Sequence, residues 1–153
     1  MKCILLLLTI MLATVATRAQ SLSAEDSVKD VINIMFSGMK NGDANVFKSV
    51  FSDSAIMQTI SRNRDGSFEV RNESLPEFTE FVGKLKKDSA DERINFETIK
   101  IDGPLAIAWT PYNFYYAGQF SHCGVNSFHL VRFSGGWKIQ YLIDTRRRQG
   151  CKP

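Results

Sequence analysis

The chain has 153 residues, of which 44% are hydrophobic and 23% charged, and its formal net charge is +3 at pH 7. Such a chain is long enough for one ordinary domain with a hydrophobic core. A net charge this close to zero argues against nucleic acid as a partner, because phosphate binding needs clustered excess positive charge.

The first residues have the layout of a secretory signal peptide. Lys2 supplies the positive start, Ile4–Val15 forms a short apolar segment, and the small residue Ala19 precedes the expected cleavage point. The apolar segment is shorter than a bilayer-spanning helix needs, although a retained membrane anchor is the alternative. We therefore expect residues 1–19 to be removed and residues 20–153 to form one exported domain, periplasmic or extracellular, without membrane attachment.

Two cysteines remain in the predicted mature chain, Cys123 and Cys151. In an exported protein such a pair is typical of a disulfide bond, and two free thiols are the alternative. A bond that closes a loop of this length would stabilise the fold by roughly 3 to 4 kcal/mol, because it restricts the unfolded chain.

The N-terminal third of the predicted domain contains two helices. Apolar residues recur at spacings of three and four within Ser21–Lys40, which is typical of an amphipathic helix with one buried face. Asn41-Gly42 ends this helix, since glycine readily adopts the left-handed conformation that follows a helix. Asp43 can then cap a second, short helix over Ala44–Phe51.

A short hairpin and a third helix follow. Strands are predicted over Ala55–Ile60 and Phe68–Arg71, with a turn between them. Ser74 opens the third helix, because Glu77 stands three residues later, as a capping box requires. Glu92–Ile101 alternates in polarity and predicts one further strand.

The last part of the chain predicts three long strands, over Leu105–Tyr116, Ser121–Phe133 and Trp137–Arg146. The connections between them are short and contain glycine, which is typical of antiparallel neighbours. The order of helix, helix, hairpin, helix and four strands predicts an α+β domain, with its three helices packed on one face of an antiparallel sheet.

The final hairpin can be registered from its turn at Ser134–Gly136. The resulting partners on one sheet face are Phe133 and Trp137, Val131 and Ile139, His129 and Tyr141, Ser127 and Ile143, Val125 and Thr145, and Cys123 and Arg147. This face is mostly apolar, so we assign it to the helix-covered side. The opposite face, assigned to solvent, carries His122, Asn126, Asp144 and Arg146. A slip of one residue would exchange the two faces.

The preceding hairpin turns near Gly118, and its register depends on the length of the loop. A three-residue loop would place Trp109 beside His129, whereas a two-residue loop would place Ala108 there. We prefer the first, because it brings the bulky side chains of this strand to the helix-facing side. Pro111 can introduce a bulge and change the register beyond it.

The preferred register gathers aromatic side chains with a few polar groups, which is typical of a small-molecule pocket. The predicted pocket residues are Trp109, Tyr115, Cys123, Ser127, His129 and Tyr141, with Asp53 at the mouth. Arg146 and Arg147 are predicted at the rim, where one of them can bind an anionic group of the ligand. The alternative is an ordinary core in which His129 is hydrogen-bonded and inert.

His129 is the predicted acid–base group if the protein is an enzyme. Tyr115 or Tyr141 would then donate a hydrogen bond to a carbonyl group of the substrate. Asp144 is expected to point outward in a structural ion pair. No metal site and no cofactor are predicted, because His122 and His129 lie on opposite faces of their strand and no other ligand spacing is present.

Several short motifs carry a resemblance to a known group of proteins. They are Asn41-Gly42-Asp43 before Phe51-Ser52-Asp53, Ala108–Tyr112, His122-Cys123-Gly124, Phe128-His129-Leu130, Gly135–Ile139 and Asp144–Arg147. Through these motifs the whole predicted domain resembles the nuclear-transport-factor-2-like superfamily, and within it the group described as Putative lumazine-binding.

The resemblance implies a cone, in which a bent antiparallel sheet wraps around a pocket closed by three helices. It also implies a homodimer formed through the outer face of the sheet. The superfamily contains isomerases, dehydratases, polyketide cyclases and non-catalytic binding domains, so the fold does not decide the function. The expectation is an exported, non-catalytic domain that binds a small hydrophobic or aromatic ligand, with a small lyase or isomerase using His129 as the alternative.

Overall fold

The computed structural model describes residues 23–151. The predicted signal peptide, residues 1–19, lies outside the described residues. Among the helices of this described range, none is long and apolar enough to cross a membrane.

Three helices lie in residues 23–151, as the sequence predicts. They are α1 (Ala24–Asn41), α2 (Ala44–Ser49) and α3 (Leu75–Lys84). Each begins at a polar capping residue, because the first N–H groups of a helix have no partner within the helix. Ser23 caps α1 by accepting a hydrogen bond from the Asp26 N–H at 3.0 Å. Asp43 and Ser74 cap α2 and α3 in the same way.

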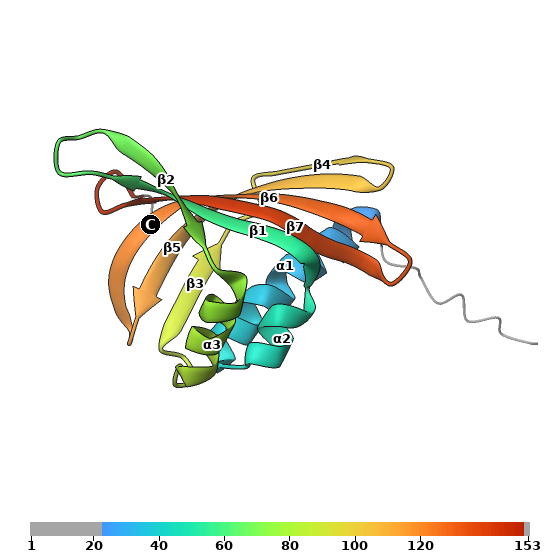
Figure 1. The fold of residues 1–153 in the computed structure, drawn as a ribbon, viewed down its shortest axis with the longest axis horizontal. Helices are drawn as coiled ribbons and strands as arrows, with labels where there is room; N and C mark the ends of the chain where they lie inside the picture. Colours follow the sequence, from blue (N-terminus) through green and yellow to red (C-terminus); the bar gives the residue numbers. More distant parts are fainter. Residues whose placement is uncertain (1–22, 152–153) are drawn as a thin grey trace, which may run out of the picture.

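The described chain contains seven strands in one sheet. They are β1 (Phe51–Arg62), β2 (Phe68–Glu73), β3 (Ala90–Ile94), β4 (Thr98–Asp102), β5 (Leu105–Tyr116), β6 (Gln119–Phe133) and β7 (Gly136–Arg147). Their order is β2-β1-β7-β6-β5-β3, with β4 also paired to β5. All pairs are antiparallel except β1 with β7, which is parallel. The predicted α+β class, a bent sheet with three helices on its concave face, is confirmed (Figure 1).

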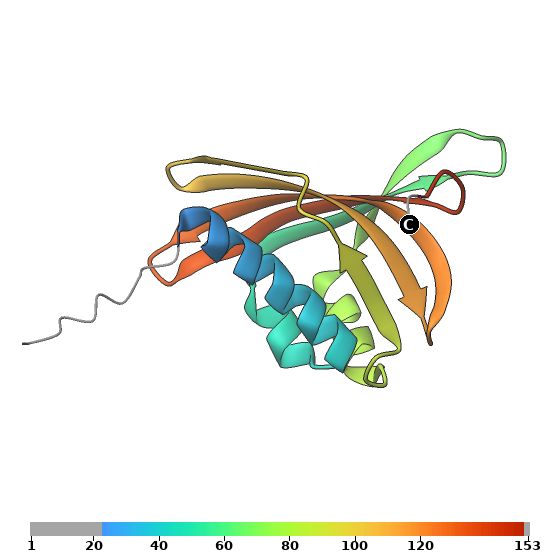
Figure 2. The same ribbon diagram turned by 180° about the vertical axis from the view of Figure 1, so that it is seen from behind.

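The predicted strand over Glu92–Ile101 is in fact two strands. β3 pairs with the C-terminal half of β5 and β4 with its N-terminal half. In the segment between them, the N–H groups of Asn95 and Glu97 donate to the carbonyl oxygens of Pro111 and Trp109 at 2.9 and 3.1 Å. The sheet bends at this break, so that β3 runs down beside the helices while β4 lies along the upper part of the sheet, above the start of α1 (Figure 2).

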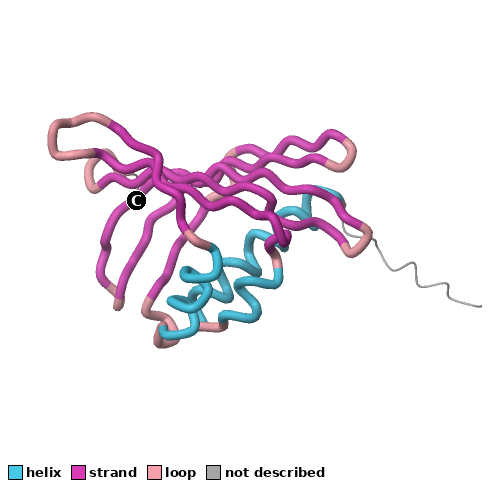
Figure 3. The backbone as a smooth tube through the Cα atoms, viewed as in Figure 1, coloured by secondary structure: helices cyan, strands magenta, loops and turns pink. Residues whose placement is uncertain are grey.

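The hydrophobic core fills the space between the concave face of the sheet and the helices, which all lie on that side (Figure 3). Phe36 of α1 meets Phe128 of β6 edge to face, with ring centres 6.2 Å apart. Burying each such side chain stabilises the fold by roughly 1.5 to 3 kcal/mol. The buried sheet residues of this core include Phe51, Met57, Ala106, Ala108, Phe128, Leu130, Trp137, Ile139 and Leu142.

The predicted register of the final hairpin is correct over only one half. His129 pairs with Tyr141 as predicted, but Leu130 pairs with Ile139, which leaves Gln140 unpaired as a β-bulge. A single extra residue exchanges the two faces of a strand beyond it. The predicted assignment of faces is therefore correct for Trp137 and Ile139, which lie in the core, but wrong for β6 and for the second half of β7, where the side that carries His129 and Tyr141 is the convex side.

The predicted register of the preceding hairpin is also wrong. Its turn has two residues, Ala117 and Gly118, whose φ angles are 49° and 79°. A second bulge leaves Ser121 unpaired, so that Ile107 stands beside His129, which neither loop length predicted. The two bulges, one in each hairpin, decide which side chains face the helices.

Candidate functional site

A row of four polar side chains crosses the concave face of the sheet. Thr59 of β1, Asp144 of β7, Asn126 of β6 and Thr110 of β5 are neighbours in the strand register, and we call them the polar row. Their exposed fractions are 4%, 9%, 4% and 0%, respectively. Burying polar side chains is unfavourable unless they are hydrogen-bonded, so a polar row on the core-facing side of a sheet requires an explanation.

Two members of the polar row are held by neighbouring side chains. Asp144 Oδ2 accepts hydrogen bonds from Tyr112 Oη at 3.0 Å and from Arg146 Nε at 2.9 Å. Asn126 Nδ2 donates to Glu92 Oε1 at 2.8 Å. These contacts bring a second carboxyl group, from β3, into the same site as Asp144.

The other two members, Thr59 and Thr110, are less well satisfied. The buried Oγ1 atom of each has no hydrogen-bond partner among the described residues. Leaving such a hydroxyl unpaired costs about 1 to 3 kcal/mol. The polar row therefore carries two uncommitted hydroxyl groups, one at each end.

A cavity of about 60 Å³ lies between the sheet and the helices, and we call it the inner cavity. Its polar wall comprises Gln58, Glu73, Glu92, Asn126, Asp144 and Arg146, and its apolar wall comprises Met35, Phe36, Met39, Phe47, Met57, Phe78 and Leu142. This volume corresponds to about two water molecules. A larger molecule would require side chains to move, and methionine is suited to this because its unbranched thioether adopts many shapes.

The carboxyl group of Glu92 is unusually weak as an acid. Burial raises the pKa of Glu92 to about 7; the hydrogen bond from Asn126 and the charge of Arg146 oppose this, and the charge of Asp144 adds to it. Near neutral pH this carboxyl group is therefore present in both forms and can either donate or accept a proton.

Two other ionisable groups at the site are held in their neutral forms. Burial, together with the charges of Asp144 and Glu92, raises the pKa of Tyr112, so its phenol remains a hydrogen-bond donor. His122 packs against the Tyr112 ring with centroids 5.7 Å apart. Burial and the charge of Arg146 lower the pKa of His122. His122 thus lies on the concave side, not on the outer face as predicted.

The raised pKa of Glu92 predicts that the fold loses stability as the pH rises. The folded protein keeps a proton that the unfolded chain releases above its ordinary pKa of 4.5, so the stabilisation is complete below 4.5 and lost through about 7. We expect the free energy of unfolding to fall by about 3 kcal/mol across this window. Urea unfolding of the Glu92→Gln variant should lack this decline, and an unchanged pH profile in the variant would contradict the assignment.

The predicted aromatic pocket does not form on the helix-covered side. Trp109, Ser127, His129 and Tyr141 lie on the convex face, where Trp109 is 46% exposed. His129 packs edge to face against Tyr141, with ring centroids 5.6 Å apart. The bulge at Gln140 is the physical reason. Trp137 and Ile139 before the bulge face the helices, whereas Tyr141 directly after it shares the opposite face with His129.

The remaining predicted pocket and rim residues are scattered. The Tyr115 ring lies under the guanidinium group of Arg93, at 4.2 Å. Asp53 is exposed and lines a groove outside the cone. Arg146 reaches the inner cavity, whereas Arg147 is exposed at the end of β7, because successive side chains of a strand point to opposite faces.

The predicted disulfide bond between Cys123 and Cys151 is confirmed. The two sulfur atoms are 2.07 Å apart and the Cα atoms 5.7 Å apart, within the normal range. The bond ties the C-terminal segment to β6, and Cys123 is only 2% exposed. Cys123 is therefore part of a structural bond and does not line the inner cavity.

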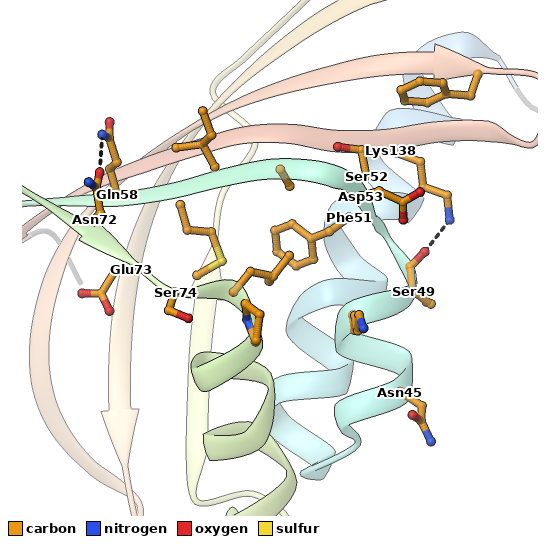
Figure 4. Close-up of a pocket in the computed structure, with 17 residues that line it drawn as sticks. Asn45, Ser49, Phe51, Ser52, Asp53, Gln58, Asn72, Glu73, Ser74 and Lys138 are labelled. Carbon is orange, nitrogen blue, oxygen red and sulfur yellow. Dashed lines mark hydrogen bonds between the residues drawn. The ribbon is translucent and has the colours of Figure 1, made fainter.

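A second, larger cavity opens on the outside of the cone, and we call it the outer groove. It has a volume of about 1020 Å³ and is bounded by β1, α2 and the first turn of α3 (Figure 4). Phe51 extends from β1 into the space between the two helices, while Asp53 and Lys138 lie near its edge (Figure 4). Met57 and Leu75 also line the groove.

Glu92 was not predicted as a site residue from the sequence, and Asn126 was predicted to face solvent. β6 contained a signal for Asn126, because Asn126 shares its face with Phe128 and Leu130, which are large and apolar. No comparable signal marked Glu92. It lies on β3, whose pairing with β5 depends on the break in the strand that the sequence left as continuous.

Comparison with known proteins agrees with this architecture. The chain matches the model of the family described as Putative lumazine-binding over residues 23–141. The crystal structure of a nuclear-transport-factor-2-like protein of unknown function from Shewanella baltica OS155 is similar, with a TM-score of 0.62 and 14% identity over 82% of this chain and 94% of that chain. A domain of unknown function with a cystatin-like fold from Nostoc punctiforme PCC 73102 has a TM-score of 0.64 and 16% identity over 85% of this chain and 81% of that chain.

None of the curated proteins matches this chain. The identities to the solved structures are low, so these structures show the fold alone. The family model, in contrast, covers well over half of the sequence. The chain therefore has the nuclear-transport-factor-2-like, cystatin-like fold and belongs to the family described as Putative lumazine-binding.

Proposed function

We propose that this protein is a small-molecule-binding domain whose ligand contacts the polar row from the inner cavity. The observation that carries this proposal is that two members of the polar row, Asn126 and Asp144, line the inner cavity together with the carboxyl group of Glu92. A cavity whose wall is apolar apart from a few convergent polar groups is typical of a small-molecule site. A ligand with hydrogen-bonding groups would contact this polar wall.

The family name supports a heterocyclic ligand. Lumazine is a flat, fused ring system that carries N–H and C=O groups side by side. Asn126 presents both a donor and an acceptor, and Glu92 can act as either near neutral pH, so this wall is complementary to such an edge. The inner cavity would have to enlarge to admit the ring, and the methionines of its apolar wall are suited to that movement.

Lumazine binding is expected to depend on the polar wall and not on the convex face. Asn126→Leu removes the amide at similar volume and should weaken binding by at least about tenfold, because it also leaves Glu92 unpaired. Isothermal titration calorimetry measures this, after thermal melting has established that the variant is folded.

His129→Ala is the control, because His129 was the residue favoured by the sequence and lies on the convex face. Its affinity for lumazine should remain within about twofold of the unmodified protein. Equal affinities of all three proteins, or a loss confined to the His129 variant, would contradict the proposed site.

Acid–base catalysis is a second candidate function, favoured by the raised pKa of Glu92. In a lyase or isomerase reaction Glu92 would move the proton, in place of His129, which is remote from the inner cavity. We prefer non-catalytic binding, because catalysis would also need a hydrogen-bond donor that stabilises charge on the substrate. The two nearby donors, Tyr112 and Arg146, already donate to Asp144. Glu92→Gln should abolish any turnover and retain binding; turnover that persists in this variant would exclude the catalytic role.

We also propose that two copies of the protein pair through the convex face. Large apolar side chains are exposed there, and contiguous exposed apolar surface usually marks an interaction site. They are Ile56, Leu105, Ile107 and Trp109.

Trp109→Glu should convert this dimer to a monomer, because it places a charge in the apolar contact. Light scattering after size exclusion measures the mass. Phe81→Glu is the matched control, since Phe81 of α3 is exposed to a similar degree, 49% against 46%, away from this face. A monomeric unmodified protein, or dissociation by the control alone, would contradict the pairing.

We further propose that the protein is exported. The disulfide bond supports this, because such bonds persist in oxidising compartments. The N-terminal sequence pattern supports it independently. The intact mass of the protein secreted from expressing cells should correspond to residues 20–153 with the bond formed. A full-length, reduced chain retained in the cytoplasm would contradict export.

A further inference from the structure

The inner cavity and the outer groove share a wall. Met57 and Glu73 face each other where the pairing of β1 with β2 ends, and both line both spaces, as does Gln58. Past this point β2 gives way to α3, so the wall is a layer of side chains and not a paired strand. Met57 is buried, with 6% of its surface exposed, yet its unbranched side chain can change rotamer without backbone movement.

The charged groups around this wall favour a cation over an anion. Glu73 lies in the wall itself, and Asp144 and Glu92 lie on its inner side. Among the described residues that line the inner cavity, Arg146 is the basic one. Its Nε already pairs with Asp144 Oδ2 at 2.9 Å. A carboxylate or phosphate entering here would meet like charge, whereas an ammonium or N–H group would be attracted.

The outer groove suits an apolar chain. Phe51 and Leu75 line it beside Met57, and its two lysines, Lys48 and Lys138, are balanced by two acidic residues. Because these charges largely cancel, the groove offers burial of apolar surface as its main attraction. Its volume of about 1020 Å³ is that of a full-sized ligand site, whereas the inner cavity holds only about 60 Å³.

We propose that the outer groove and the inner cavity are two halves of one binding site, separated by Met57 as a movable partition. The ligand is an amphipathic molecule whose N–H-bearing head reaches Glu73 and Glu92 and whose apolar tail lies in the outer groove. This inference rests on the proposed function, and it extends the N–H-bearing group bound in the inner cavity by an apolar tail in the outer groove.

The head group is tested with two probes that share one tail, decylamine and decanoate. Calorimetric titration near neutral pH should show decylamine binding at least about tenfold more tightly than decanoate. Equal affinities, tighter binding of decanoate, or no binding of either probe would overturn the assignment of the head group.

The tail is tested by comparing decylamine with butylamine, which is too short to extend along the groove. Leu75→Ser should weaken decylamine by about tenfold and leave butylamine within about twofold, because only the long chain lies against Leu75. Leu85→Ser is the matched control, since Leu85 is a partly buried leucine at the other end of α3 that lines neither space. Equal loss for both amines, or loss in the control, would overturn the two-part site.

The partition is tested with two methionines. Met57→Ala should tighten decylamine several-fold, about three- to tenfold, because the tail no longer displaces the thioether. Met39→Ala removes the same atoms from a residue that lines the inner cavity alone, and it should not increase the affinity for decylamine. Tightening in neither variant, or in both equally, would exclude the role of Met57.

These outcomes separate the further inference from the proposed function. If Asn126→Leu weakens lumazine but the amines bind without dependence on Leu75 or Met57, only the two-part site falls. If Asn126→Leu leaves both lumazine and decylamine unaffected, the inner cavity itself is excluded as the binding site.

Discussion

The Cys123→Ser, Cys151→Ser double variant is expected to melt roughly 10 to 15 °C below the unmodified protein. The bond spans 28 residues of sequence, and closing such a loop stabilises by about 3 to 4 kcal/mol through the unfolded chain. For a domain of this size, each kcal/mol corresponds to roughly 4 °C in the melting temperature. Differential scanning calorimetry under non-reducing conditions measures the shift.

Reduction provides the control for this prediction. A reducing agent should lower the melting temperature of the unmodified protein to that of the double variant, and it should leave the variant unchanged. A melting temperature that is insensitive to both treatments would mean that the bond does not form in solution or does not restrain the unfolded chain.

The Gly124→Ala variant is expected to lose about 3 kcal/mol or more of unfolding free energy. A methyl group at this position would lie 1.7 Å from the Thr145 carbonyl oxygen and 2.7 Å from the Tyr112 ring. The first contact is with backbone, so β6 and β7 would have to separate. Displacement of Tyr112 would also break its hydrogen bond to Asp144, so ligand binding should fall together with stability.

Gly135→Ala is the matched control for Gly124→Ala. Gly135 lies in the turn between β6 and β7, and a methyl group there would have no atom within 4 Å. Chemical denaturation should show a change in unfolding free energy below about 0.5 kcal/mol for this variant. Similar losses in both variants would show that the close approach at Gly124 does not decide its effect.

Local sequence signals predicted the elements of this fold because each depends on neighbouring residues. The capping residues Asp43 and Ser74 mark the starts of α2 and α3, as their hydrogen bonds to nearby N–H groups require. Gly42 ends α1 with a φ of 68°, a conformation that glycine adopts without strain. The disulfide bond was one of two alternatives for a pair of cysteines, and the fold brings the pair within bonding distance.

The candidate site was predicted incorrectly because the face of a strand is not a local property. The sequence correctly paired His129 with Tyr141, and Asn126 with Asp144 on the opposite side. The side that carries His129 and Tyr141 was then assigned to the helices, which is wrong. The bulge at Gln140 is the reason, because residues of one parity face the helices before it and residues of the other parity face them after it. Asn126 and Asp144, which were predicted to face solvent, are two members of the polar row on the concave face.

The sequence by itself determined the helices and their ends, most strands, the α+β class and the family resemblance. Only the tertiary structure decided the two bulges, the division of one predicted strand into β3 and β4, and the contact between Glu92 and Asn126. The physical reason is that side chains alternate with a period of two, so one inserted residue inverts a face. Where that residue is inserted depends on the curvature of the whole sheet around its core.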